Sequence, residues 1–325
     1  MQDRLPRLES RGQTIPASQS TAVQSYLASE LKGHTGSVSA LHYNSDGRTL
    51  VTTGEDATLR VWNVAGSSLT RTIDLDDGPA TALALSGSNA LTGHANGQIV
   101  LWNYERAEKL ATFKRNDAQI WGLAFVGSDT RFAAVSHDWK VTLWDTAQRS
   151  APVQVIDAHD NAAHAVAFAS TARGPLLVTG SADKSVKLWN LDTLDAVRSY
   201  RGHSDFVTAV AVTSGGTMLA SGGLDGGIRL WSPNSSRAQR RLYGHRGRVG
   251  GLSFSPSGDT LASASEDGQV RIWDFKHGRT AKTLTGSAGS VRTVQFSPDG
   301  QQLASAGSDG IIRLWRNPLA PSLTN

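Results

Sequence analysis

The sequence predicts an all-β fold in which seven similar β-sheets form a closed ring. Seven of the nine tryptophans recur at intervals of 40 to 45 residues, and six residues before each of them stands Asp or Asn. Short alternating apolar runs separated by Gly- and Pro-containing turns fill each interval, and they leave no span for a helix. The recurrent tryptophans are Trp62, Trp102, Trp144, Trp189, Trp231, Trp273 and Trp315.

The sixth repeat shows how one unit is built. The apolar runs RVGGLSF, TLASAS and QVRIWDF are separated by the turns SPSGD and EDG. A sheet of about four such strands cannot bury both of its faces alone, so the units must stack on one another. Closing the stack into a ring removes the open end. The predicted fold is therefore a seven-bladed β-propeller of four-stranded antiparallel blades over residues 21–317, between flexible tails at 1–20 and 318–325.

Composition limits the classes of function. The chain of 325 residues has no Cys, which excludes disulfides and thiolate sites, and its net charge is only +4. This charge falls short of what binding to nucleic acid requires, so the composition argues against that function. No apolar run reaches the roughly 18 residues needed to span a membrane, and the first thirty residues lack the apolar stretch of a secretory signal. We expect an intracellular, cytoplasmic protein.

At the level of motifs the chain resembles the WD-repeat β-propeller family. The segments that carry the resemblance, over about residues 26 to 316, include GHTGSV, LVTTGEDATLRVWN, GHSDFV, LASGGLDGGIRLWS, GHRGRV and LASASEDGQVRIWD. In that family the sequence repeat and the blade are offset by one strand. The resemblance implies that SYLASEL (Ser25 to Leu31) is the last strand of the seventh blade and closes the ring.

A recurring set of His, Ser or Thr, Asp and Trp invites comparison with a catalytic triad. The resemblance implies a structural role instead, in which the four side chains form a buried hydrogen-bonded chain, and recurrence around the ring favours that role. The complete sets are His34, Thr52, Asp56 and Trp62; His159, Thr179, Asp183 and Trp189; His203, Ser221, Asp225 and Trp231; and His245, Ser263, Asp267 and Trp273. The other three repeats are incomplete, with Asp76 and Asn96, Asn116 and Ala134, and Ser287 at the variant positions.

Other patterns typical of catalytic or metal sites are weak. The run from Asp74 to Gly78 departs from the spacing of a calcium loop, and His159 and His164 are a poor metal pair without further ligands. The stretch from Ser308 to Trp315 does not have the spacing of the Asp box found in propeller enzymes. The sequence predicts no metal, no cofactor and no enzymatic activity.

Function in this fold usually lies on the loops of one rim. Three positions per repeat are expected there: three and five residues after the recurrent His, and one before the recurrent Asp. In WD-repeat proteins these positions commonly contact partners. We expect a monomeric interaction scaffold that binds a protein or peptide with an apolar anchor and acidic groups. The predicted contact residues are Gln119, Trp121, His137, His164, Phe206, Leu224, Arg248, Glu266 and Arg292.

A second candidate surface is the basic cluster Arg237, Arg240, Arg241, Arg246 and Arg248. A solvated outer strand is its ordinary interpretation. The alternative function is binding of an anionic ligand, such as nucleic acid, a phosphorylated protein or a lipid headgroup. A regulatory domain within a larger multidomain protein is a further alternative.

Overall fold

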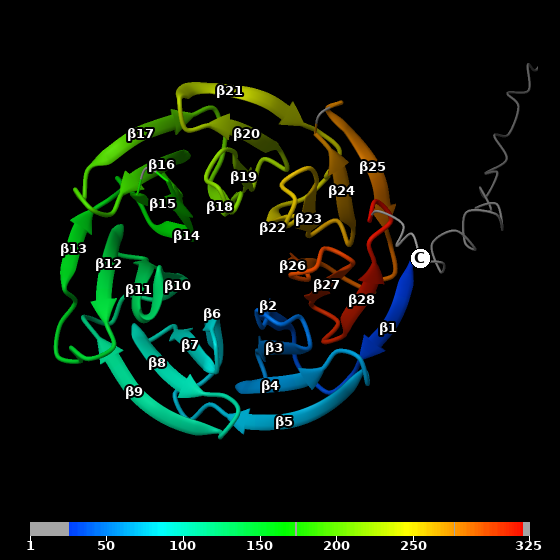
Figure 1. Ribbon diagram of the computed structural model, residues 1–325, viewed down its shortest axis with the longest axis horizontal. Coiled ribbons are helices and arrows are strands. Elements are labelled where there is room, and N and C mark those ends of the chain that lie inside the picture. Colours follow the sequence, from blue (N-terminus) through cyan, green and yellow to red (C-terminus); the bar gives the residue numbers. More distant parts are fainter. Residues whose placement is uncertain (1–25, 173, 276, 321–325) are drawn as a thin grey trace, which may run out of the picture.

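The fold is a ring of seven four-stranded antiparallel sheets, as Figure 1 shows. The computed structural model describes residues 26–172, 174–275 and 277–320, and within them it contains 28 strands and no helix. The predicted all-β, seven-bladed propeller is confirmed. Each blade begins at the central axis and steps outward strand by strand, so its fourth strand lies on the circumference.

The strands of the first four blades follow one another in sequence. They are β2 Val38–Tyr43, β3 Thr49–Gly54, β4 Thr58–Asn63 and β5 Ser68–Asp74; β6 Ala80–Ser86, β7 Asn89–His94, β8 Gln98–Asn103 and β9 Glu108–Lys114; β10 Ile120–Val126, β11 Ser128–Ser136, β12 Lys140–Asp145 and β13 Gln154–Asp157; and β14 Ala163–Thr171, β15 Gly174–Ser181, β16 Ser185–Asn190 and β17 Ala196–Arg201.

The last three blades include one strand from the other end of the chain. They are β18 Val207–Val212, β19 Leu219–Gly223, β20 Ile228–Ser232 and β21 Ser235–Leu242; β22 Val249–Phe254, β23 Leu261–Ser265, β24 Val270–Asp274 and β25 Arg279–Leu284; and β26 Val291–Phe296, β27 Gln302–Gly307, β28 Ile312–Arg316 and β1 Leu27–Leu31.

Strand β1 closes the ring by pairing antiparallel with β28, as the sequence predicts. Leu27 lies opposite Trp315 and Leu31 opposite Ile312, and the backbone N–H of Arg316 donates to the carbonyl oxygen of Tyr26 at 2.7 Å. Ser25 and the expected N-terminal tail (1–20) lie outside the described residues. The expected C-terminal tail (318–325) is described only as far as residue 320.

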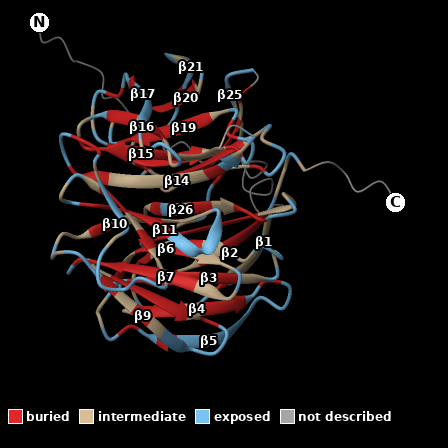
Figure 2. Cartoon of the chain, turned by 60° about the vertical axis from the view of Figure 1, so that its left-hand side comes forward, coloured by how far each residue is buried: buried red, intermediate tan, exposed pale blue. Residues whose placement is uncertain are grey.

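The hydrophobic cores lie between blades. Seven clusters of buried apolar side chains are present, and each combines residues of two neighbouring blades. The cluster at the closure packs Leu31 and Trp62 against Ile312 and Leu314. Figure 2 shows buried middle strands and an outer strand β5 that is largely exposed. Ring closure therefore completes a hydrophobic core as well as a hydrogen-bonded sheet.

Replacing Leu31 with Ala tests the closure. Leu31 is 1% exposed, so we expect the cavity left behind to lower the free energy of unfolding by about 2–5 kcal/mol. Thermal and denaturant unfolding measure the loss. The exposed Ala28→Ser change on the same strand is the control. Equal melting temperatures for Leu31→Ala and the wild type would show that β1 is dispensable.

Candidate partner-binding site

A β-bulge occurs at the same place in every innermost strand. Each strand skips one residue in its register with the second strand of the blade, for example Trp121 between Ile120 and Gly122. A bulge bends the strand and re-aims the side chain of the extra residue. The seven bulged residues are Ser39, Thr81, Trp121, His164, Thr208, Gly250 and Arg292. They are the seven positions that lie five residues after the recurrent His or its substitute.

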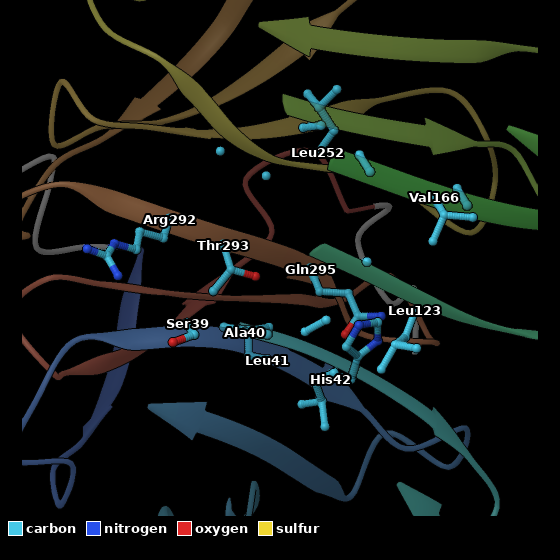
Figure 3. A pocket seen from close by; sticks show the side chains of 18 of the residues that line it. Ser39, Ala40, Leu41, His42, Leu123, Val166, Leu252, Arg292, Thr293 and Gln295 are labelled. Atoms are coloured by element: carbon cyan, nitrogen blue, oxygen red, sulfur yellow. The ribbon is translucent and has the colours of Figure 1, made fainter. Parts of the chain in front are cut away.

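The bulged residues surround a cavity of about 800 Å³ on the axis of the ring. The innermost strands of all seven blades line it, and 17 of the 39 lining residues are Ala, Gly, Ser or Thr. Small side chains keep the axis open, since seven strands converge there. Figure 3 shows His42 beside Gln295 deeper in the cavity, with Arg292 farther along the same wall. The amide oxygen of Gln295 accepts the backbone N–H of Tyr43 at 2.7 Å, which holds this side chain in place.

Three aromatic side chains from consecutive blades form a row near the cavity. The rings of Trp121 and His164 have centroids 5.0 Å apart, and those of His164 and Phe206 stack at 6.1 Å. Burial lowers the pKa of His164 to about 4, and the charges of Arg248 and His137 act in the same direction. His164 is therefore neutral at physiological pH and adds to an apolar surface. The indole Nε1 of Trp121 is buried and has no hydrogen-bond partner among the described residues.

Two ion pairs flank this aromatic row. Arg292 Nη1 donates to Glu55 Oε1 at 2.6 Å, and Arg248 Nη1 lies 3.8 Å from Glu266 Oε1. All four side chains are 38–53% exposed, and pairs of this kind are worth only about 0–1 kcal/mol. The carboxylate of a bound molecule could therefore exchange with Glu55 or Glu266 at little cost.

The other predicted contact residues lie beside the row. The backbone N–H of His137 donates to the carbonyl oxygen of Gln119 at 2.9 Å, and that of Leu224 donates to the carbonyl oxygen of Phe206 at 2.9 Å. The backbone N–H of Glu266 likewise donates to the carbonyl oxygen of Arg248 at 3.0 Å. Gln119, His137 and Leu224 are not among the residues that line the cavity. The structure thus brings eight of the nine predicted residues into backbone pairs and one aromatic row, and it pairs the ninth, Arg292, with Glu55.

The four complete polar sets form the same hydrogen-bonded chain in their blades. In the first, Trp62 Nε1 donates to Thr52 Oγ1 at 2.9 Å, Thr52 lies 2.8 Å from His34 Nε2, and His34 Nδ1 lies 2.9 Å from Asp56. A carboxylate only accepts, so Nδ1 carries the ring proton and the hydroxyl donates to Nε2. The equivalent bonds of the other three sets measure 2.7–3.0 Å.

These chains hold the Asp carboxylates ionised. Burial alone would raise the pKa of Asp56, but the hydrogen bonds from His34, Thr58 and the backbone outweigh it and lower the pKa overall. Asp183, Asp225 and Asp267 are lowered for the same reasons. Each carboxylate also accepts the backbone N–H next to its His, as Asp56 does from Thr35 at 3.1 Å. In these four blades the hydrogen-bonded side chains thereby hold in place the loop that precedes the innermost strand.

The second blade builds an equivalent chain from a different position. His94 Nε2 lies 3.0 Å from Thr92 Oγ1, which accepts Trp102 Nε1–H at 3.0 Å. His94 Nδ1 bonds the carbonyl oxygen of Gly78 at 3.1 Å instead of an Asp. Sequence reasoning missed His94 because it searched for His only upstream of the first strand. The signal was available, since His94 stands where blades one and five have Gly54 and Gly223.

The third and seventh blades also form their polar hydrogen bonds with different residues. In the third, Thr142 replaces the missing hydroxyl and accepts Trp144 Nε1–H at 2.9 Å, while Asn116 donates to Asp138 at 2.8 Å. In the seventh, Arg313 Nη1 donates to Asp309 at 2.7 Å, and Ser287 adds a bond of 3.2 Å. Every recurrent Trp therefore donates to a hydroxyl group.

The structure divides the basic cluster predicted from sequence. Arg248 lines the cavity beside Glu266, whereas Arg237, Arg240 and Arg241 belong to the outer strand β21. The run from Asp74 to Gly78 holds no metal-ligand cluster, and Asp77 pairs with Lys109 at 2.7 Å. No group of three His, Cys, Asp or Glu side chains suited to a metal occurs in the part of the chain that the structure describes. That part of the chain contains no helix, and therefore no helix that could cross a membrane.

Comparison with known proteins identifies the family. The family model described as WD domain, G-beta repeat matches residues 25–63, 107–145, 150–190, 194–232, 236–274 and 278–316, well over half of the chain. The protein belongs to the WD-repeat family. The matched segments leave out residues 64–106, which contain most of the second blade and its altered hydrogen-bonded chain.

Several curated proteins resemble parts of the chain. Nuclear distribution protein PAC1 of Gibberella zeae is 28% identical over 38% of this chain and 28% of its own length. Telomerase protein component 1 of Rattus norvegicus is 27% identical over 56% of this chain and 7% of its own length. WD repeat-containing protein SL1-17 of Schistosoma mansoni is 25% identical over 50% of this chain and 53% of its own length. The chain thus spans only part of these relatives.

The substitution His94→Ala tests the altered chain of the second blade. It leaves the buried Thr92 hydroxyl without one partner, so we expect a loss of about 1–3 kcal/mol in the free energy of unfolding. His34→Ala in the first blade should cost a similar amount, and the exposed Asp76→Ala change should have little effect. A larger loss for Asp76→Ala than for His94→Ala, measured by denaturant unfolding, would refute this assignment.

Stability should fall as the pH is lowered from about 7 to about 4.5. Burial lowers the pKa of His42 and of His164 to about 4, below the value of about 6.5 in an unfolded chain. Over this range the unfolded state binds more protons, so acid favours unfolding. The lowered Asp pKa values extend the loss below pH ~4. Melting temperature against pH measures the effect, and His164→Gln should flatten the curve. A curve unchanged by that substitution would contradict the assignment.

Proposed function

We propose that the protein is a non-catalytic interaction scaffold that binds a protein or peptide at the mouth of the central cavity. One observation carries the proposal: three consecutive blades contribute Trp121, His164 and Phe206 to a single aromatic row at the cavity. The hydrogen-bonded chains of the blades do not use these side chains. Phe206 is 37% exposed and its neighbour Leu224 41% exposed, so a partner would cover apolar surface that now faces water.

The chemistry around the row describes the partner. An apolar side chain would pack on the aromatic rings, and an acidic group would replace Glu55 or Glu266 beside Arg292 and Arg248. A hydrogen-bond acceptor could satisfy Trp121 Nε1 if the indole turns on binding. Tryptophan and arginine are the residues whose truncation most often costs about 2 kcal/mol or more at an interface. The preferred ligand is thus a segment with an apolar anchor and nearby carboxylates.

The family supports an interaction role in general terms, because the chain is a WD-repeat propeller. The functions that the names of its relatives indicate are those of the relatives. A monomeric propeller and a cytoplasmic location stay predictions from the sequence, as does a role as a regulatory domain of a longer protein.

A pull-down from the source cell tests the rim. The variant Trp121→Ala, Phe206→Ala, Arg292→Ala should lose a specific partner that the wild type retains, because it removes the apolar platform and one arginine. A matched control changes three exposed side chains on outer strands, Leu69→Ala, Val155→Ala and Arg71→Ala. Both variants must keep the circular dichroism spectrum and melting temperature of the wild type. An unchanged set of partners in the rim variant would refute the proposal.

A further inference from the structure

The outer strands of the ring differ in charge. Strands β17, β21 and β25 contain seven cationic side chains and no acidic one, and we call these residues the basic belt. The belt consists of Arg198, Arg201, Arg237, Arg240, Arg241, Arg279 and Lys282. Of the other four outer strands, β5 and β9 contain both signs, with Arg71, Asp74, Glu108, Lys109 and Lys114, whereas β1 and β13 contain a single acidic residue each, Glu30 and Asp157.

The belt is continuous along the circumference. Figure 1 shows β17, β21 and β25 following one another along the outer edge of the ring. Arg198 Nε donates to the carbonyl oxygen of Pro233 at 2.9 Å, and Tyr200 Oη donates to that of Ser232 at 3.1 Å. Both bonds tie β17 to the turn that leads into β21. The cations of β17 and β21 therefore form one surface, and those of β25 follow along the same edge of the ring.

The middle of the belt carries charge that the fold does not neutralise. Arg237 and Arg241 are exposed, and neither forms an ion pair with a described acidic residue. Arg241 also lies directly opposite Arg229 in the register of β20 and β21. Like charges at such positions are destabilising. Asp225 balances Arg229 at 3.0 Å and leaves Arg241 without a counter-charge.

Strand β21 also has an open backbone edge. It is the last strand of its sheet and pairs only with β20. Its eight residues make it the longest of the outer strands. An open edge presents unpaired N–H and C=O groups that an extended peptide can join as an added strand. Charges on edge strands usually prevent such pairing, but charges of one sign repel only chains of the same sign.

We propose that the edge of β21 is a second docking surface, separate from the rim, for an extended acidic protein segment. The segment adds to the fifth blade as a fifth strand, and its carboxylates pair with Arg237 and Arg241. Arginine suits this role because its guanidinium binds a carboxylate through two parallel hydrogen bonds. A nucleic acid fits less well, because it cannot continue a β-sheet. Tyr200, within β17, is buried, but Tyr243 directly after β21 is 68% exposed, so a nucleic acid that stacks on it is the occupant to be tested against the peptide.

Fluorescence anisotropy tests the proposal with a labelled peptide of alternating Glu and Thr, as long as β21. We expect binding that weakens with added salt and falls at least about tenfold in the double variant Arg237→Glu, Arg241→Glu. The matched control is Arg71→Glu, an exposed arginine on the outer strand β5, which should leave binding unchanged. The same loss in both variants would refute a specific site on β21.

Two further probes separate strand addition from simple charge attraction. A peptide N-methylated at alternate residues keeps its carboxylates but cannot donate the ladder hydrogen bonds, so it should bind at least about tenfold more weakly. A single-stranded oligonucleotide of equal charge should also bind more weakly than the unmodified peptide. Equal binding of the methylated peptide, or tighter binding of the oligonucleotide, would overturn the proposal. Both results are independent of the rim variant.

Discussion

The stability of each blade depends on the blade beside it, because no blade contains a core of its own. A four-stranded sheet has two faces, and the apolar residues of both must leave water. All seven clusters of buried side chains lie between neighbouring blades. Closure therefore buries apolar surface, since β1 completes both the seventh sheet and the cluster around Leu31 and Trp62.

Closure also shapes the axis of the ring. Seven innermost strands converge on one cavity, and many of the residues that line it are small, such as Gly122 and Ala124. At the mouth, the bulge in each of these strands turns one extra side chain out of the regular pattern. In two blades that residue is Thr, and its hydroxyl donates to a carbonyl of the next blade, as Thr208 does to Val249 at 2.7 Å. In others it is Trp121, His164 or Arg292. The same backbone irregularity thus joins blades in one place and presents larger side chains in another.

The polar chains illustrate how a fixed requirement is met by different residues. Every recurrent Trp needs an acceptor for its indole N–H, because an unpaired buried donor costs about 1–3 kcal/mol. Thr52, on the strand beside Trp62, provides it in the first blade, and Thr142, on the same strand as Trp144, provides it in the third. His94 likewise replaces the usual upstream His in the second. The regular sets were predictable from spacing. The spacing of the regular sets did not find the substitutes, because these stand at other sequence positions and the folded sheet brings them to the same point.

The sequence by itself determined the number of blades, the strand pattern and the closing strand. These follow from local periodicity: apolar alternation, turn residues and a Trp at a nearly constant interval all act over a few residues. It also predicted the rim positions, since they are counted from the recurrent His and Asp. The tertiary structure alone decided which of these residues meet. It placed His164 between Trp121 and Phe206, paired Arg248 with Glu266, and separated Arg248 from the arginines of β21. The aromatic contacts join residues about forty positions apart, and their geometry depends on the stacking of complete blades around the ring.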